Sequence, residues 1–128
     1  MISLTLALEL RDAGLPWQPG PGDRFAVTRT EMIDDVFHVA DMVIEARQLD
    51  TGTLFAFNGT TEWALDSVAQ SATVWLPTEG QLREALGDRF ARLTRDGREF
   101  VVELDDGTTH RDADAENAYA AALLTVLA

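Results

Sequence analysis

The stretch from Leu54 to Leu86 constrains the fold most, because apolar segments and turn-forming residues alternate in it at short intervals. Its first segment, 54–57, is apolar and aromatic, which is typical of a buried strand. Gly59 then permits backbone angles that a strand does not use. A second apolar segment covers 72–76. We therefore expect a strand, a turn, a helix, a second strand and a second helix, with the rest of the chain packed around them.

The first of these helices is predicted to begin at Thr60 or Thr61, whose hydroxyl can accept a backbone N–H bond and stabilise the start by about 1 kcal/mol. Its apolar positions at helical spacing are Ala64, Leu65, Val68 and Ala69. Trp63 lies on the opposite side of that helix. We favour an interpretation in which another element covers its ring, and the alternative is a partly exposed anchor.

The second helix is predicted to begin at the segment 78–81, which reads Thr-Glu-Gly-Gln and matches the capping-box pattern. Leu82, Ala85 and Leu86 should share one face, and Gly87 is suited to end the helix. The strand before it carries Trp75. Burying an indole removes about 150–250 Å² from water, worth at most about 4–6 kcal/mol, so this ring should matter for stability.

The length of 128 residues indicates one domain, 1–128, that can bury about two-thirds of its unfolded surface. With no Cys, the chain has no disulfide, no thiolate nucleophile and no cysteine-held metal. All ten basic residues are Arg, which excludes Schiff-base chemistry and the P-loop lysine. We expect no cofactor.

The formal net charge of −12 opposes binding to nucleic acid or to anionic membranes. It fits a soluble protein, which is the interpretation that we favour, or a protein with a basic partner. We expect the partner to be another protein. Glu9 and Arg11 interrupt the apolar N-terminal segment, so we expect neither a signal peptide nor a membrane-spanning helix, and a cytoplasmic location follows by default.

Two further elements are predicted ahead of the central stretch. Ser3 is suited to cap a first helix that Gly14 ends. Residues 24–28 are predicted to form a strand.

Residues 31–48 fit two alternatives. As a helix, they would place Asp34, His38, Asp41 and Glu45 on one face, where carboxylates and an imidazole could bind a metal or act in acid–base catalysis. As two strands, 36–39 and 42–49, they would lead through a turn at 50–52 into the strand at 53–57. We favour the strands, and the helix stays open as the alternative.

The C-terminal third is predicted to form a strand meander over 89–94, 99–104 and 108–111, followed by a helix that Asp112 or Asp114 starts. The Asp-Gly pairs at 96–97 and 106–107 are strong hairpin signals. If 106–107 is a two-residue turn, Glu103 faces His110 across the strands, which we interpret as a surface pair.

Four segments resemble known proteins, namely 10–17 with 22–25, 57–68, 75–77 with 81–82, and the terminal helix at Ala118 and Tyr119. They resemble a family of small, uncharacterised bacterial proteins, mainly actinobacterial, of which some members are labelled pilus assembly protein. The resemblance spans most of the chain and implies no established activity and no site residues. The label usually implies a nucleotide-binding ATPase, but this chain has neither a P-loop pattern nor a Lys.

The predicted fold is a single α+β domain with a mainly antiparallel sheet flanked by three or four helices. The leading functional hypothesis is a non-catalytic interaction or accessory module, associated with pilus assembly by the family label only. Its predicted contact surface is formed by Asn58, Thr60, Thr61 and Trp63. One rival is a small metal-dependent hydrolase that uses Asp34, His38, Asp41 and Glu45, and another is an acidic decoy for a nucleic-acid-binding protein.

Overall fold

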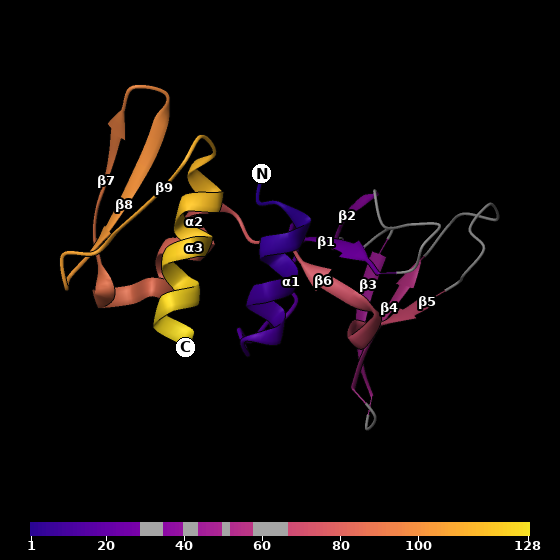
Figure 1. Ribbon diagram of the computed structural model, residues 1–128. Helices are drawn as coiled ribbons and strands as arrows, with labels where there is room; N and C mark the ends of the chain where they lie inside the picture. The colour runs from indigo at the N-terminus through magenta and orange to yellow at the C-terminus, as the bar shows by residue number, and fades with distance from the viewer. Residues whose placement is uncertain (29–34, 40–43, 50–51, 58–66) are drawn as a thin grey trace. The chain divides into compact units, whose positions relative to one another are not determined.

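The computed structural model describes residues 1–28, 35–39, 44–49, 52–57 and 67–128 (Figure 1). These residues form α-helices and antiparallel strands, which confirms the α+β class. They group into two compact units, which we call the terminal unit (Met1–Pro16 with Pro77–Ala128) and the middle unit (Trp17–Leu76). The stretch 54–86 was predicted to form one centre around which the rest of the chain packs. It is instead divided between the two units after Leu76.

The strands of the described part of the chain form three three-stranded sheets rather than one. In the middle unit, β1 (Arg24–Val27) lies between β2 (Val36–His38) and β6 (Thr73–Trp75). A second sheet there has β4 (Gly52–Phe57) between β3 (Ile44–Leu49) and β5 (Ser67–Ala69). The short helix η1 (Gln70–Ala72) joins β5 to β6.

Aromatic rings run across the β2-β1-β6 sheet. Phe25 in the central strand lies opposite Phe37 on one side and opposite Trp75 on the other. The Phe25 and Phe37 ring centroids are 5.6 Å apart. Trp17 stacks on Trp75 with centroids 6.0 Å apart and an interplanar angle of 2°. Because Phe25 is fully buried, these rings form much of the apolar interior around β1.

The preference for strands at 31–48 is confirmed where the structure describes this segment, since 36–38 and 44–49 are strands and the helical alternative is wrong there. Gly52, which was predicted in the turn, belongs to β4 and pairs with Leu49, and the rest of the predicted turn, 50–51, lies outside the described residues. The predicted helix after Thr60 is wrong at its end, because 67–69 form β5 along β4. Apolar residues at helical spacing in so short a run do not distinguish a helix from a strand, and pairing with β4 satisfies their backbone groups.

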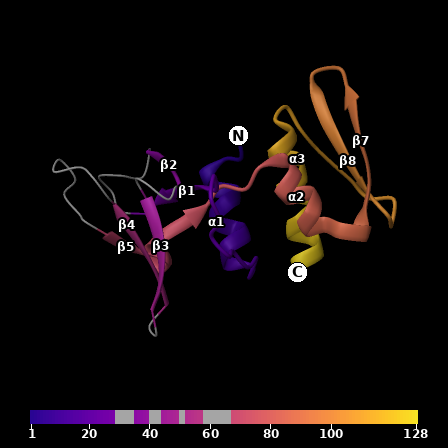
Figure 2. The same cartoon turned by 180° about the vertical axis from the view of Figure 1, so that it is seen from behind.

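The terminal unit contains α1 (Leu4–Asp12), α2 (Glu79–Leu86), α3 (Ala115–Leu127) and the sheet β7 (Phe90–Asp96), β8 (Glu99–Leu104) and β9 (Thr109–Asp112). The helix η2 (Gly87–Arg89) leads into β7. Helix α3 contacts α1, α2, β8 and β9, and it lies beside α2 in Figures 1 and 2. It buries alanines together with Tyr119 and Leu123, and β8 buries Val102 and Leu104.

Three of the predicted helix starts, at Ser3, Thr78 and Asp114, are confirmed by their capping contacts, while the start predicted at Thr60 or Thr61 lies outside the described residues. Ser3 Oγ accepts a hydrogen bond from the backbone N–H of Leu6 at 3.2 Å. Thr78 and Gln81 form the reciprocal capping box, with the Gln81 N–H donating to Thr78 Oγ1 and the Thr78 N–H to Gln81 Oε1. Asp114 caps α3. Ala85 was expected on the buried face of α2 but is exposed, while Leu82 and Leu86 are buried.

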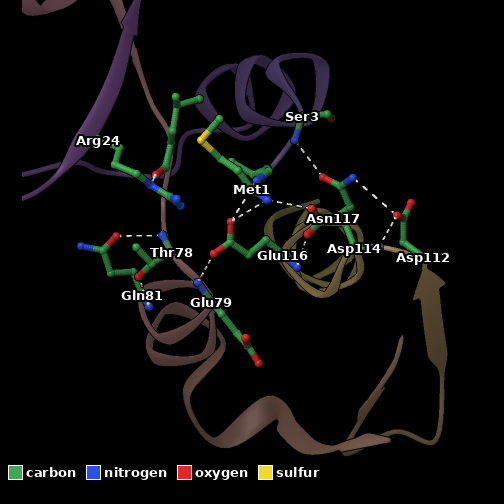
Figure 3. Close-up of polar contacts among 12 residues, drawn as sticks. Met1, Ser3, Arg24, Thr78, Glu79, Gln81, Asp112, Asp114, Glu116 and Asn117 are labelled. Atoms are coloured by element: carbon green, nitrogen blue, oxygen red, sulfur yellow. Dashed lines mark hydrogen bonds and ion pairs between the residues drawn. The ribbon is translucent and has the colours of Figure 1, made fainter. Parts of the chain in front are cut away.

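Glu116, in the first turn of α3, holds three separate segments of the terminal unit together (Figure 3). Its Oε1 accepts a hydrogen bond from the backbone N–H of Ile2 at 3.0 Å, and its Oε2 accepts one from that of Glu79 at 2.9 Å. Next to it, the Ser3 N–H donates to Asn117 Oδ1 at 2.8 Å. The start of the chain and the start of α2 are thus positioned by polar side chains of α3.

Candidate functional site

The contact surface predicted from the sequence, formed by Asn58, Thr60, Thr61 and Trp63, lies outside the residues that the structure describes. It therefore stays a prediction.

The residues of the metal-site alternative are not gathered on a helical face. Asp34 and Asp41 lie outside the described residues. His38 ends β2 and Glu45 is in β3, and these strands belong to different sheets. The hydrolase hypothesis required a helix here, so it loses its geometric basis. Within the described ranges, no group of three or more His, Cys, Asp or Glu residues could hold a metal ion.

The predicted pair of Glu103 and His110 is wrong by one residue. Glu103 lies opposite Thr109, and His110 lies opposite the buried Val102. The Leu104 N–H donates to the Thr108 carbonyl at 3.0 Å, so the loop has three residues instead of two. A one-residue shift moves a side chain to the other face of a sheet. The His110 Nε2 atom is accordingly buried, without a hydrogen-bond partner.

A locally basic segment leads into and along β7. Residues 89–98 contain four of the ten arginines of the chain and one acidic residue, Asp96, which gives a formal charge of +3 (4 − 1) in a chain of −12. Arg92, Arg95 and Arg98 follow each other at intervals of three. None of the expectations drawn from the sequence concerned this segment, although the regular arginine spacing can be recognised there.

Strand β7 is an edge strand of its sheet, which has the order β7-β8-β9. In the part of the chain that the structure describes, no other strand pairs with its outer side. All its residues except Phe90 and Leu93 are exposed. Its pairing with β8 is irregular between Phe90 and Arg92, which is a feature that commonly modifies sheet edges.

A two-residue turn ends β7. Asp96 pairs with Glu99, so Gly97 and Arg98 form the turn, and Gly97 has φ of 63° while Arg98 has no positive φ. Glycine at the first of two central positions is typical of a type II′ turn, whose twist matches the strands that it joins. The turn therefore places the Arg98 side chain at the tip of the hairpin.

The solvent-facing side of the sheet carries paired charges. Arg92 Nε lies 3.3 Å from Glu103 Oε2, and Arg111 Nη2 lies 3.2 Å from Asp96 Oδ2. The side chains of Arg92 and Asp96 are 66% and 68% exposed, so each pair contributes about 0–1 kcal/mol and can open for another ligand.

The arginines near the turn are held differently. Arg95 has its guanidinium carbon 5.7 Å from the Phe100 ring centroid and donates from Nε to the Gly97 carbonyl at 3.2 Å. None of the ion pairs within the described ranges involves Arg95 or Arg98. We call β7 with its turn, residues 90–98, the β7 edge. It combines a strand edge with positive charge that these ion pairs leave unneutralised.

The other end of β7 is ordered by charge-assisted contacts. Arg89 Nε donates to Asp105 Oδ1 at 2.8 Å, and this hydrogen bond raises the pKa of the Arg89 guanidinium. Hydrogen bonds from the Thr108 hydroxyl and N–H lower the pKa of Asp106. The Arg89–Asp105 contact joins the β8–β9 loop to the residue before β7, while the Thr108–Asp106 hydrogen bonds lie within the loop itself.

Comparison with known proteins identifies no relative: no family model, no curated protein and no solved structure matches the chain. No helix within the described residues combines the length and the apolarity that crossing a membrane requires.

Proposed function

We propose that the chain is a non-catalytic protein-interaction module, an accessory component of a larger assembly, and that it contacts its partner through the β7 edge. The observation that carries this proposal is the exposed edge strand with a charge of opposite sign to that of the chain. An edge strand presents backbone donors and acceptors that another chain can pair with. A local charge of opposite sign also orients an approaching partner toward this edge.

The segment 58–63, predicted from the sequence as the contact surface, is the second surface to test. The acidic-decoy hypothesis requires carboxylates gathered on one face. The solvent-facing side of the β7-β8-β9 sheet alternates arginines with carboxylates instead, as the pairs of Arg92 with Glu103 and of Arg111 with Asp96 illustrate. This face does not support the decoy.

Co-purification of the tagged full chain from its native host tests the proposal. The variants are Arg95→Glu and Arg98→Glu, with Arg11→Glu as the matched control, because Arg11 is an exposed arginine of α1 and the change in charge is the same. We expect Arg98→Glu to lose a protein that the wild type and the control both retain. Far-UV circular dichroism should show that all variants fold.

Retention of the same protein by both β7 variants would show that the β7 edge is not the contact surface. In a parallel arm, loss of the protein with Trp63→Ala alone would assign the contact to the segment 58–63. The hypothesis of a metal-dependent hydrolase is tested by measuring the melting temperature of the protein at increasing concentrations of divalent metal ions. We expect no shift, and a saturable increase would support metal binding.

A further inference from the structure

We infer that the β7 edge binds an acidic, extended segment of a partner protein as a fourth strand of the β7-β8-β9 sheet. This inference rests on the proposed function and specifies the chemistry of the partner. Backbone pairing and charge complementarity support it separately.

The hairpin register shows which backbone groups of β7 face outward. Asp96 and Glu99 flank a two-residue turn, so they exchange both hydrogen bonds with each other. Hydrogen-bonded and non-hydrogen-bonded pairs alternate along antiparallel strands. The pair of Arg95 with Phe100 and that of Leu93 with Val102 are therefore the non-hydrogen-bonded ones. The N–H and C=O groups of Leu93 and Arg95 point away from β8, where an added strand would meet them.

The side chains along this edge define the charge of the added strand. Arg92 and Arg95 are three residues apart, so they lie on opposite faces of the sheet. A strand placed beside β7 brings its own side chains next to each of them. Carboxylates on both faces of that strand would satisfy both arginines, and Arg98 at the turn would add a third positive charge. The matching occupant is an extended segment with closely spaced Asp or Glu residues.

A charged edge strand is also a general defence against unwanted pairing. The positive sign of the charge on β7 distinguishes defence against pairing in general from binding of an acidic segment. Carboxylates on β7 would repel a second copy of a protein of charge −12, and arginines do not repel acidic segments. Pairing of β7 with β7 of a second copy would put arginines near each other, and like charges opposite each other are destabilising. An acidic segment of another protein therefore fits this edge better than a second copy.

Nuclear magnetic resonance of the ¹⁵N-labelled full chain tests the inference with a synthetic peptide that repeats Glu-Glu-Val-Val and is capped at both ends, so that an extended conformation places carboxylates on both of its faces. One control peptide has Lys in place of Glu, and another carries N-methyl groups on alternate backbone nitrogens. We expect the Glu peptide to shift the resonances of β7 and to slow amide exchange at Leu93 and Arg95. The amides of Thr94 and Asp96 already bond to β8, so their exchange should change little.

Neither control peptide should reproduce this protection. Arg95→Glu should weaken binding of the Glu peptide about fivefold, since it replaces an attractive cross-strand pair with a repulsive one. Arg11→Glu should leave binding unchanged.

Equal binding of the N-methylated peptide would show a contact made by charge alone and would overturn strand addition. The proposed function would still stand if the co-purified protein depended on the arginines. No binding of the Glu peptide, or shifts confined to other strands, would also overturn the inference. Concentration-dependent dimerisation that Arg95→Glu changes would assign the edge to a second copy instead.

Discussion

The β2-β1-β6 and β7-β8-β9 sheets have the same number of strands and the same antiparallel pairing, but they are closed over different distances along the chain. In the β7-β8-β9 sheet, each strand pairs with the next one across a short turn. In the β2-β1-β6 sheet, Arg24 Nε donates to the Leu76 carbonyl across 52 positions. Bringing together strands that are far apart in the sequence costs more conformational entropy. Contacts between distant side chains must therefore stabilise the β2-β1-β6 sheet.

The two units use different side chains to join segments that are distant in the sequence. Aromatic rings around Phe25 bring β6 to β1 in the middle unit. In the terminal unit, the carboxylate of Glu116 bonds segments that are distant in the sequence. All three tryptophans fall within 17–76, and Tyr119 is the one tyrosine of the chain. Tryptophan fluorescence therefore reports on the middle unit, while far-UV circular dichroism reports on both.

The largest expected effect comes from Phe25→Ala, which breaks the aromatic closure of the middle unit. Phe25 is fully buried, and its ring lies 5.9 Å from Trp17 and 5.6 Å from Phe37. The free energy of unfolding should fall by about 3–5 kcal/mol because a large buried ring is lost. Urea unfolding followed by tryptophan fluorescence measures it.

The control for this change is Val36→Ala on the neighbouring strand, where the side chain is 37% exposed. It should change stability by about 0.5 kcal/mol or less. If both substitutions had similar effects, the aromatic contacts would not be what closes this sheet.

Glu116→Ala should reduce stability by about 1.5–3 kcal/mol, because the half-buried N–H groups of Ile2 and Glu79 lose a charged acceptor. Urea unfolding followed by far-UV circular dichroism measures the loss. Glu84→Ala removes an exposed carboxylate from α2 and should have an effect near zero. Equal effects of the two variants would mean that Glu116 does not join the segments of the terminal unit energetically.

Gly97→Ala tests the local closure of the β7–β8 hairpin. Gly97 has φ of 63°, and an alanine there should cost about 1–2 kcal/mol because its Cβ disfavours this conformation. Thermal unfolding should show a lower melting temperature. Gly80→Ala, in α2 with open space around the added Cβ and no positive φ, should instead stabilise the protein slightly. A neutral Gly97→Ala would indicate that distant contacts, and not the turn, determine this sheet.

The smallest effect concerns acid stability in the terminal unit. Burial raises the pKa of Asp114, but hydrogen bonds from the N-terminal amine and from the Glu116 N–H outweigh it and hold the pKa below its ordinary 3.8. Because the folded pKa is the lower one, this contribution to stability is present above 3.8 and is lost as the pH falls through the folded pKa.

Asp114→Asn should therefore reduce stability near neutral pH, while having less effect in acid. Unfolding free energies at neutral pH and below the ordinary pKa measure the difference. The effect should be small, because the Asp114 side chain is 34% exposed. Asp88→Asn removes an exposed carboxylate elsewhere and serves as the control. An Asp114→Asn variant with the same loss at both pH values would contradict this linkage.

The elements that the sequence predicts well are those that depend on neighbouring residues. The capping box at Thr78 and Gln81 and the C-terminal meander both rest on contacts within a few positions. The errors concern choices between similar local alternatives. The turn at 105–107 has one residue more than predicted, which moved His110 to the other face of the sheet. Residues 67–69 joined β4 as a strand because pairing across the sheet outweighed a weak helical pattern.

The candidate site likewise combines a local feature that the sequence shows with strand pairing that it does not show. The arginines of residues 89–98 were visible in the sequence, but nothing local indicated that β7 would be an edge strand. The metal hypothesis at His38 and Glu45 depended on a helix, and strand pairing placed these residues in separate sheets.

The sequence by itself determined the helix caps at Ser3, Thr78 and Asp114, the presence of the two C-terminal hairpins, the α+β class and the local excess of positive charge, because each follows from residues close together in the chain. Only the tertiary structure decided the division after Leu76, the pairing of β1 with β6 and the position of β7 at an edge. These features depend on which distant segments pair, and many pairings satisfy the same local preferences. The free energy of burying side chains together selects among them.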